Sequence, residues 1–349
     1  MMGISYNEEL DQFYKSDFYF SYSSINKLLY SPAAFYKHYI LNQKEDMVDA
    51  HLVAGKVVHC LLLEPDKFND EFIVIPSNLP KDNNRLLVDE VFKVFQSQPD
   101  TDLTLADFSD TIISVLLGIN LHQSLVDDKK PNKEGVMLTG DEKKVAKMLT
   151  EQNIQYFEFL KVKQNKTIVD QTTLDSAKES VELLRNHETV RSLMQLDNDK
   201  DENVKIYNEE GVQLRSSKYK FGFKGILDNV VMDHNTKTLF INDLKTTGKA
   251  IQDFPDSVQY YKYWIQAVMY KQLSLGKYLK GLPDASEWKV VITFIVIDRA
   301  NLIYPFQVSP ETLKVWEEDF KEILNVVDYH YSNKDFTLPY ELATGKIKL

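Results

Sequence analysis

The stretch from residue 204 to 245 constrains the fold most, because here the sequence changes from a helical pattern to a period of two. Runs rich in Val, Ile, Phe and Tyr alternate with residues typical of turns, at 208–211 and 233–236. The expected strands are 204–207, 212–216, 221–228, 229–233 and 238–245.

The elements that follow this stretch suggest the fold class. A helix is expected over 257–275, then a strand over 289–297 and a helix over 310–331. Strands that alternate with helices in this way predict an α/β (α+β) core, in which a central mixed sheet is flanked by helices.

The first half of the chain is predicted to be mainly helical, with expected helices that include 52–64, 140–160 and 175–196. A chain of 349 residues normally forms one to three domains, and we expect a single domain spanning 1–349. Within it, 20–75 is the helical N-terminal part of the core, 77–165 a helical insertion of unknown role, and 168–331 the sheet with its helices.

The composition excludes several classes of protein. A single cysteine, Cys60, excludes an internal disulfide and a cysteine-ligated zinc or iron–sulfur site. No stretch approaches 18 uninterrupted apolar residues, and residues 1–11 lack a basic start and an apolar run, so we expect neither a membrane span nor a secretory signal. These features fit a cytoplasmic protein, either of a cell or of a virus acting in its host. The net charge of −11 argues against tight coating of nucleic acid, but weighs little against an enzyme with a narrow, ion-bridged channel.

Two aspartates and a lysine fall on the predicted strands with a spacing that is typical of a metal-binding catalytic site. Asp243 and Lys245 are two residues apart, so they share one face of a strand, and Asp228 ends a neighbouring strand. Carboxylates bind hard divalent cations through oxygen, and a nearby ammonium can orient or deprotonate a water. These three residues therefore suit metal-assisted hydrolysis of a phosphodiester. An isolated Asp-x-Lys is more often a solvated strand edge.

Further polar residues lie on the neighbouring helices. His59 falls on the apolar helix over 52–64, and Gln266 and Tyr270 are four apart on the helix over 257–275, so they share a face. Each has a plainer interpretation, as a core histidine with one hydrogen bond or as ordinary helix residues.

Taken in order, four motifs resemble the PD-(D/E)xK nuclease superfamily, and most closely its exodeoxyribonuclease VIII and RecB-like exonuclease branch of phage recombination systems. The motifs are Gly55-x-x-x-His59, Lys224-Gly225-x-x-Asp228, Asp243-Leu244-Lys245-Thr246-Thr247 and Gln266-x-x-x-Tyr270. The resemblance covers 20–75 and 168–275 and leaves 77–165 unexplained. The chain departs from the family in having Ile226-Leu227, and no arginine, just before the first aspartate.

The resemblance implies a restriction-endonuclease-like core and a role for each residue. Asp228, Asp243, the Leu244 carbonyl and His59 would hold Mg²⁺, for which Mn²⁺ could substitute. Lys245 would activate the water, and Glu202 would be the additional upstream glutamate, although Glu209 and Glu210 lie close to it in the sequence. Gln266, Tyr270 and Thr246 would lie on the substrate side.

The implied activity is Mg²⁺-dependent exonucleolytic hydrolysis of double-stranded DNA ends. The implied partners are DNA, a single-strand annealing protein and further copies of the chain in a ring. Two alternatives stay open: a structure-specific endonuclease of the same fold, and a catalytically idle DNA-binding or assembly module.

One aromatic cluster supports two interpretations. Phe254, Tyr260, Tyr261, Tyr263 and Trp264 lie at the start of the expected helix over 257–275. Aromatic rings can stack on the bases of single-stranded nucleic acid, or the cluster can pack the helix against the sheet.

Overall fold

The computed structural model describes residues 18–43, 50–121, 140–163, 166–196 and 201–347, and residues 1–11, on which the signal argument rests, lie outside them. The chain divides into two compact units: Met1–Pro65 together with Ala177–Leu349, and Asp66–Ser176. That the chain is one functional domain stays a prediction. Among the described residues, no helix is long and apolar enough to cross a bilayer.

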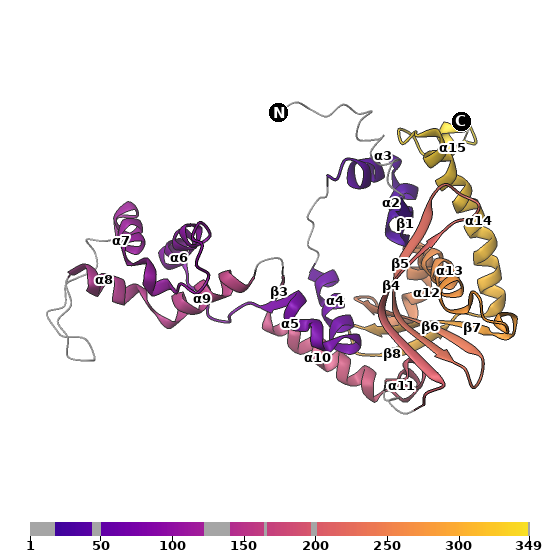
Figure 1. The fold of residues 1–349 in the computed structure, drawn as a ribbon, viewed down its shortest axis with the longest axis horizontal. Helices are drawn as coiled ribbons and strands as arrows, with labels where there is room; N and C mark the ends of the chain where they lie inside the picture. Colours follow the sequence, from indigo (N-terminus) through magenta and orange to yellow (C-terminus); the bar gives the residue numbers. More distant parts are fainter. Residues whose placement is uncertain (1–17, 44–49, 122–139, 164–165, 197–200, 348–349) are drawn as a thin grey trace. The chain divides into compact units, whose positions relative to one another are not determined.

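The first unit is built on a six-stranded mixed sheet (Figure 1). β4, β5 and β6 run antiparallel in sequence, β7 is parallel to β6, β8 is antiparallel to β7, and β1 adds parallel to the start of β5. The strands are β1 (Tyr19–Phe20), β4 (Val204–Arg215), β5 (Gly222–Asp233), β6 (Thr238–Thr247), β7 (Lys289–Asp298) and β8 (Ile303–Gln307).

Helices cover both faces of this sheet. Consecutive strand residues point to opposite faces. Asn242 of β6 bonds a carbonyl of α11 (Glu188–Met194), whereas Asp243 bonds a side chain of α13 (Tyr263–Ser274), so these two helices lie on opposite faces (Figure 1). The other helices of this unit are α2 (Tyr22–Tyr30), α3 (Pro32–Phe35), α4 (Ala50–Leu63), α12 (Phe254–Tyr260), α14 (Pro310–Asn333) and α15 (Tyr340–Ala343). The prediction of a central mixed sheet flanked by helices is confirmed.

The core sits where β7 and α13 are covered on all sides. β7 reads as an almost continuous apolar run, and Phe294, Ile295 and Val296 in succession are buried. A strand buried on both faces needs such a run, because neither face meets water. α13 is likewise buried from Ile265 to Tyr270, since it packs between the sheet and α14. Residues on these two elements are therefore held rigidly.

Two predicted boundaries are wrong in ways that matter for function. The turn expected at 208–211 is absent, because β4 runs through it and stays paired with β5 on both sides. Glu209 takes a left-handed backbone, φ 46°, at the position where the pairing of β4 with β5 is interrupted between Asn208 and Glu210. The helix expected over 257–275 is broken into α12 and α13, with Lys262 at φ 56° between them.

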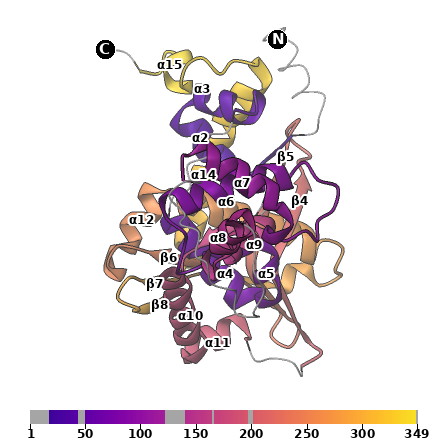
Figure 2. The ribbon, with the colours of Figure 1, turned by 90° about the vertical axis from the view of Figure 1, so that its left-hand side faces the viewer.

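The second unit is mainly helical, and Figure 2 shows α6 to α9 grouped together. It has its own core, in which Leu87, Ile112 and Phe157 are fully buried. The helix expected over 140–160 is interrupted before Thr150, whose hydroxyl caps α9 by accepting from the Asn153 amide. Its elements are α5 (Phe68–Glu71), β2 (Phe72–Val74), α6 (Asp82–Phe95), α7 (Ser109–Gly118), α8 (Gly140–Met148), α9 (Glu151–Val162) and β3 (Thr167–Val169), and α10 (Gln171–Asn186) contains its C-terminal boundary.

Candidate metal centre

The site lies where β5 and β6 separate. Their ladder ends at the pair Asn229 and Asn242, although β5 extends back to Gly222 and β6 forward to Thr247. Beyond that pair, the backbone groups of β6 that would bond β5 need other partners. The Leu244 amide donates to Asp228 Oδ2 at 2.8 Å, and the Leu244 carbonyl accepts from His59 Nε2 at 3.0 Å. The parting of the strands therefore explains why these two side chains meet at Leu244.

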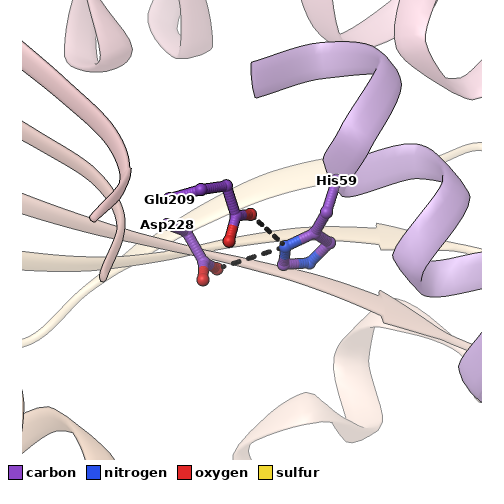
Figure 3. A group of neighbouring side chains, drawn as sticks. All are labelled: His59, Glu209 and Asp228. Carbon is purple, nitrogen blue, oxygen red and sulfur yellow. Dashed lines mark hydrogen bonds and ion pairs between the residues drawn. The ribbon is translucent and has the colours of Figure 1, made fainter. Parts of the chain in front are cut away.

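A histidine and two carboxylates converge at this point, and Figure 3 shows the three side chains together. His59 reaches in from α4, and its Nδ1 lies 3.3 Å from Glu209 Oε1 and 3.7 Å from Asp228 Oδ2. One ligand atom from each residue lies within 4.8 Å of the other two. Ligands of a single Ca²⁺ or Mg²⁺ lie 2.0–2.6 Å from it, and so at most about 5 Å from one another. The three side chains therefore fit a shared divalent cation.

The glutamate of this cluster is Glu209, and Glu202 is not brought to the site. Glu202 lies in an exposed turn just before β4. Glu210 is also absent from the cluster, because Lys277 and Tyr278 bind its carboxylate. Asn-Glu-Glu-Gly has the composition of a turn, whereas the structure holds Glu209 within a strand. Its left-handed backbone costs about 1–3 kcal/mol, a kind of strain that clusters at functional sites.

Asp243, Lys245, Gln266 and Tyr270 form a second group next to the cluster. Asp243 Oδ2 lies 2.5 Å from Lys245 Nζ, and Asp243 Oδ1 accepts from Gln266 Nε2 at 2.9 Å. The same Gln266 nitrogen lies 2.9 Å from the Tyr270 hydroxyl. Asp243, Gln266 and Tyr270 are buried. Gly225 leaves room for this arrangement, because a Cβ there would lie 2.8 Å from the Tyr270 ring.

Burial and mutual charge shift the pKa values of these groups. Burial raises the pKa of Asp243 to about 6, with Lys245 opposing the shift and Asp228 adding to it. Burial likewise raises the pKa of Asp228, against the opposing charges of His59 and Lys245. Burial alone would lower the pKa of Lys245, but Asp243 and Asp228 outweigh it, and the net shift is upward. The lysine therefore keeps its proton while these carboxylates are charged.

The hydrogen bonds of His59 specify its protonation. A carbonyl can only accept, so the contact with Leu244 requires a proton on Nε2. Nδ1 faces the carboxylate of Glu209, which favours a second proton. Burial lowers the pKa of His59, but Asp228 and the hydrogen bond to Glu209 outweigh it and the pKa is raised. Without a cation, the imidazolium compensates the two carboxylates.

The donor set suits a hard divalent cation. It offers two carboxylates, the carbonyl oxygen of Leu244 and one imidazole nitrogen. Carboxylate and carbonyl oxygens suit Mg²⁺ and Mn²⁺, and the imidazole is a usual ligand of softer metals. The residues therefore fit a divalent metal site, and the roles of Asp228, His59 and the Leu244 carbonyl as ligands remain predictions. Asp243 is adjacent to the three clustered side chains, where it contacts Lys245 and Gln266, and its role as a ligand likewise remains a prediction.

A row of asparagines that the sequence analysis missed lies behind the acidic residues. Asn229 Nδ2 donates to Asn208 Oδ1 at 2.8 Å, and Asn242 Nδ2 donates to Asn229 Oδ1 at 2.8 Å. The row also donates to helix carbonyls: from Asn208 to Leu63 of α4, from Asn229 to Met194 and from Asn242 to Leu193 of α11. Each asparagine is the chain neighbour of a site acid. That adjacency is the sequence signal that could have revealed the row.

The last predicted residue, Thr246, is exposed at the end of β6, and its hydroxyl would lie 2.9 Å from a Cβ added at Gly55 of α4. Gly55 thus lets α4 approach β6 closely enough for His59, four residues on, to reach Leu244. A substrate-binding role for Thr246, Gln266 and Tyr270 stays a prediction.

Comparison with known proteins adds a structural likeness. No family model matches the chain, and no curated protein matches it. A solved structure described as "Putative exonuclease", from Eubacterium rectale, has a TM-score of 0.43 and 11% identity, and the match covers 100% of this chain and 95% of that chain. At this level of similarity the likeness indicates nothing about activity, and only the residues of the site bear on function.

Proposed function

We propose that the protein is a metal-dependent nuclease that hydrolyses phosphodiester bonds in DNA. The observation that carries the proposal is the position of Lys245 beside Asp243, at the point where β5 and β6 part and His59, Glu209 and Asp228 converge. The order of the sequence motifs supports it, as does the fit of the cluster to a divalent cation.

His59, Glu209, Asp228 and the Leu244 carbonyl would hold the cation, which we take to be Mg²⁺, with Mn²⁺ as a substitute. When bound, such a cation polarises a phosphate and stabilises the charge that develops on its oxygens. Asp243 orients Lys245 through their ion pair, and Gln266 orients Asp243. Lys245 remains protonated beside both aspartates, so its ammonium donates hydrogen bonds that position the attacking water and offset phosphate charge.

Exonuclease action at double-stranded ends is the specific form that we propose. The exonuclease form rests on the family resemblance alone, as do the ring, the annealing-protein partner and the role in phage-type recombination. The proposed cytoplasmic location rests on the composition of the chain. A structure-specific endonuclease and an idle DNA-binding module are the alternatives.

Digestion of two DNA forms tests the proposal. End-labelled linear DNA and covalently closed circular DNA are incubated with the protein in Mg²⁺, in Mn²⁺ or in EDTA. We expect metal-dependent loss of the linear form while the circle survives. Cutting of the circle would identify an endonuclease, and DNA binding without cleavage in either metal would favour the idle module.

A further inference from the structure

A row of three tyrosines leads from Lys245 to the molecular surface. Lys245 Nζ lies 5.0 Å from the centroid of the Tyr263 ring, which stacks on Tyr261 with centroids 5.5 Å apart. Tyr260 then meets Tyr261 edge to face, with centroids 4.9 Å apart. Exposure increases outward, because Tyr263 is partly buried, Tyr261 is 42% exposed and Tyr260 is 74% exposed. The two outer rings therefore do not belong to the core.

The backbone that carries these rings is held in place. Tyr260 ends α12, and the left-handed Lys262 separates it from α13. The Tyr261 carbonyl accepts from Asn26 Nδ2 at 3.1 Å and from the Tyr22 hydroxyl, both on α2. A left-handed lysine is unfavourable, so the surrounding contacts must fix it. The break in the helix thus presents Tyr260 and Tyr261 on a fixed frame.

A lysine accompanies the exposed rings. Lys249 Nζ lies 5.6 Å from the centroid of Tyr260 and 5.6 Å from that of Tyr261. Lys249 is exposed just after β6, and its backbone amide donates to Thr247 Oγ1 at 3.1 Å. This surface therefore places flat aromatic faces beside a positive charge. It is connected to Lys245 through the stacked rings of Tyr261 and Tyr263.

These features match the chemistry of unpaired nucleotides. A base offers a π-face that stacks on tyrosine whatever its identity, and its phosphate is attracted to lysine. Bases inside a duplex already stack on one another, so only unpaired bases can use the rings. This contact needs no base-specific hydrogen bond.

We propose that Tyr260 and Tyr261, with Lys249, form a stacking platform that binds unpaired nucleotides of a DNA strand leading into the site at Lys245. The inference rests on the proposed function and deepens it, because it assigns the substrate as DNA whose end carries a single-stranded overhang or frays open. The phosphodiester to be cut and the stacked bases then belong to the same strand.

Binding measurements in EDTA test the platform separately from cleavage. The probes are a fluorescein-labelled blunt duplex and the same duplex with an overhang of about six nucleotides, within the usual size of a single-strand site. We expect Tyr260→Ala and Tyr261→Ala each to weaken overhang binding by about fivefold to hundredfold, and so to reduce the preference for overhang over blunt DNA. Tyr260→Phe keeps the ring and should stay within about twofold of wild type.

Tyr30→Ala is the matched control, because Tyr30 is 86% exposed on α2 in the same unit, and it should retain the full preference. A wild-type protein that binds both probes equally, or tyrosine variants that retain its preference, would overturn the platform. Cleavage by the wild type in Mg²⁺ or Mn²⁺ is scored separately. Loss of overhang preference in the variants of a protein that cuts neither DNA would support the platform and refute the nuclease proposal.

Discussion

The two faces of the sheet at the site carry different polar residues: acids on one face and amides on the other. On β4, β5 and β6, Glu209, Asp228 and Asp243 stand beside Asn208, Asn229 and Asn242 in the chain. The amides bond one another and the carbonyls of α4 and α11, so the row is neutral and each of its three amide nitrogens has an acceptor. The acids are crowded, and burial raises the pKa of Asp228 and Asp243. The amide row should therefore stabilise the fold, whereas the acidic row should serve chemistry at a cost in stability.

The largest effect is expected from Lys245→Ala. This change removes the ammonium that pairs with Asp243, and loss of a group that positions the reacting water should slow cleavage by about 10²- to 10⁴-fold. The measurement is the single-turnover rate on end-labelled linear DNA. Lys205→Ala, an exposed lysine on β4, is the control and should cut normally. A cleavage rate close to wild type in Lys245→Ala would show that Lys245 has no catalytic role.

The amide row and the acidic row should differ in how much each contributes to the free energy of unfolding. Asn229→Ala leaves partners in the partly buried Asn208 and the buried Asn242 unsatisfied, and we expect the free energy of unfolding to fall by about 2–4 kcal/mol. Asp228→Asn keeps an acceptor for the Leu244 amide and removes a poorly solvated charge, so stability should change by less than about 1 kcal/mol.

Urea unfolding of both variants, followed by circular dichroism, makes this comparison. Asp228→Asn should also abolish cleavage, since the variant loses a carboxylate of the cluster. The contrast between the rows fails if Asp228→Asn destabilises the protein as much as Asn229→Ala does.

Cation binding should depend on pH through the acidic row. The pKa of Asp243 is raised from 3.8 to about 6, so without a cation the folded state holds a proton there that the unfolded state has lost. Stability of the metal-free protein should therefore fall as pH rises across this interval. His59 and Asp228, whose pKa values are also raised, must lose protons to ligate a cation.

The increase in melting temperature caused by Mn²⁺ should accordingly be larger at about pH 8 than at about pH 5. At 100 times the dissociation constant the stabilisation amounts to about 2.7 kcal/mol. Scanning calorimetry at both pH values provides the measurement, with Asp228→Asn as the variant that should lose the difference. An increase that is equal at both pH values would mean that the cation binds elsewhere.

The smallest effect concerns the strained glutamate. Glu209→Gly removes a carboxylate and suits the left-handed backbone, so stability without metal should rise by about 0.5–1 kcal/mol while the Mn²⁺-induced increase in melting temperature shrinks. Glu202→Gly, in the exposed turn, should leave the Mn²⁺ effect unaltered. If Glu202→Gly reduces that effect and Glu209→Gly does not, the glutamate chosen from the sequence alone is the functional one.

The sequence predicted the parts of the site that depend on local pattern. The period of two located β6 and the residues of β5, although it divided β5 into 221–228 and 229–233. The Asp-x-Lys spacing placed Asp243 and Lys245 on one face, where the structure pairs them. The helical spacing of Gln266 and Tyr270 likewise predicted their shared face, and the two side chains contact each other.

Features decided by tertiary contacts were not predicted. Nothing in the composition marks the break at Lys262, which involves no Gly or Pro and is held by hydrogen bonds from α2 to the Tyr261 carbonyl. Pairing along β5 overrides the turn composition around Glu209. β8 was missed because Pro305 lowers strand propensity, which an edge position tolerates.

A crystal soaked with Mn²⁺ tests the central claim most directly, through its anomalous signal. We predict a single peak in the gap between β5 and β6, within about 2.6 Å of oxygens of Glu209 and Asp228, with the His59 ring released from at least one of its present hydrogen bonds. A saturated crystal with no peak there, and with the contact between His59 and Glu209 intact, would contradict the assignment of a metal centre.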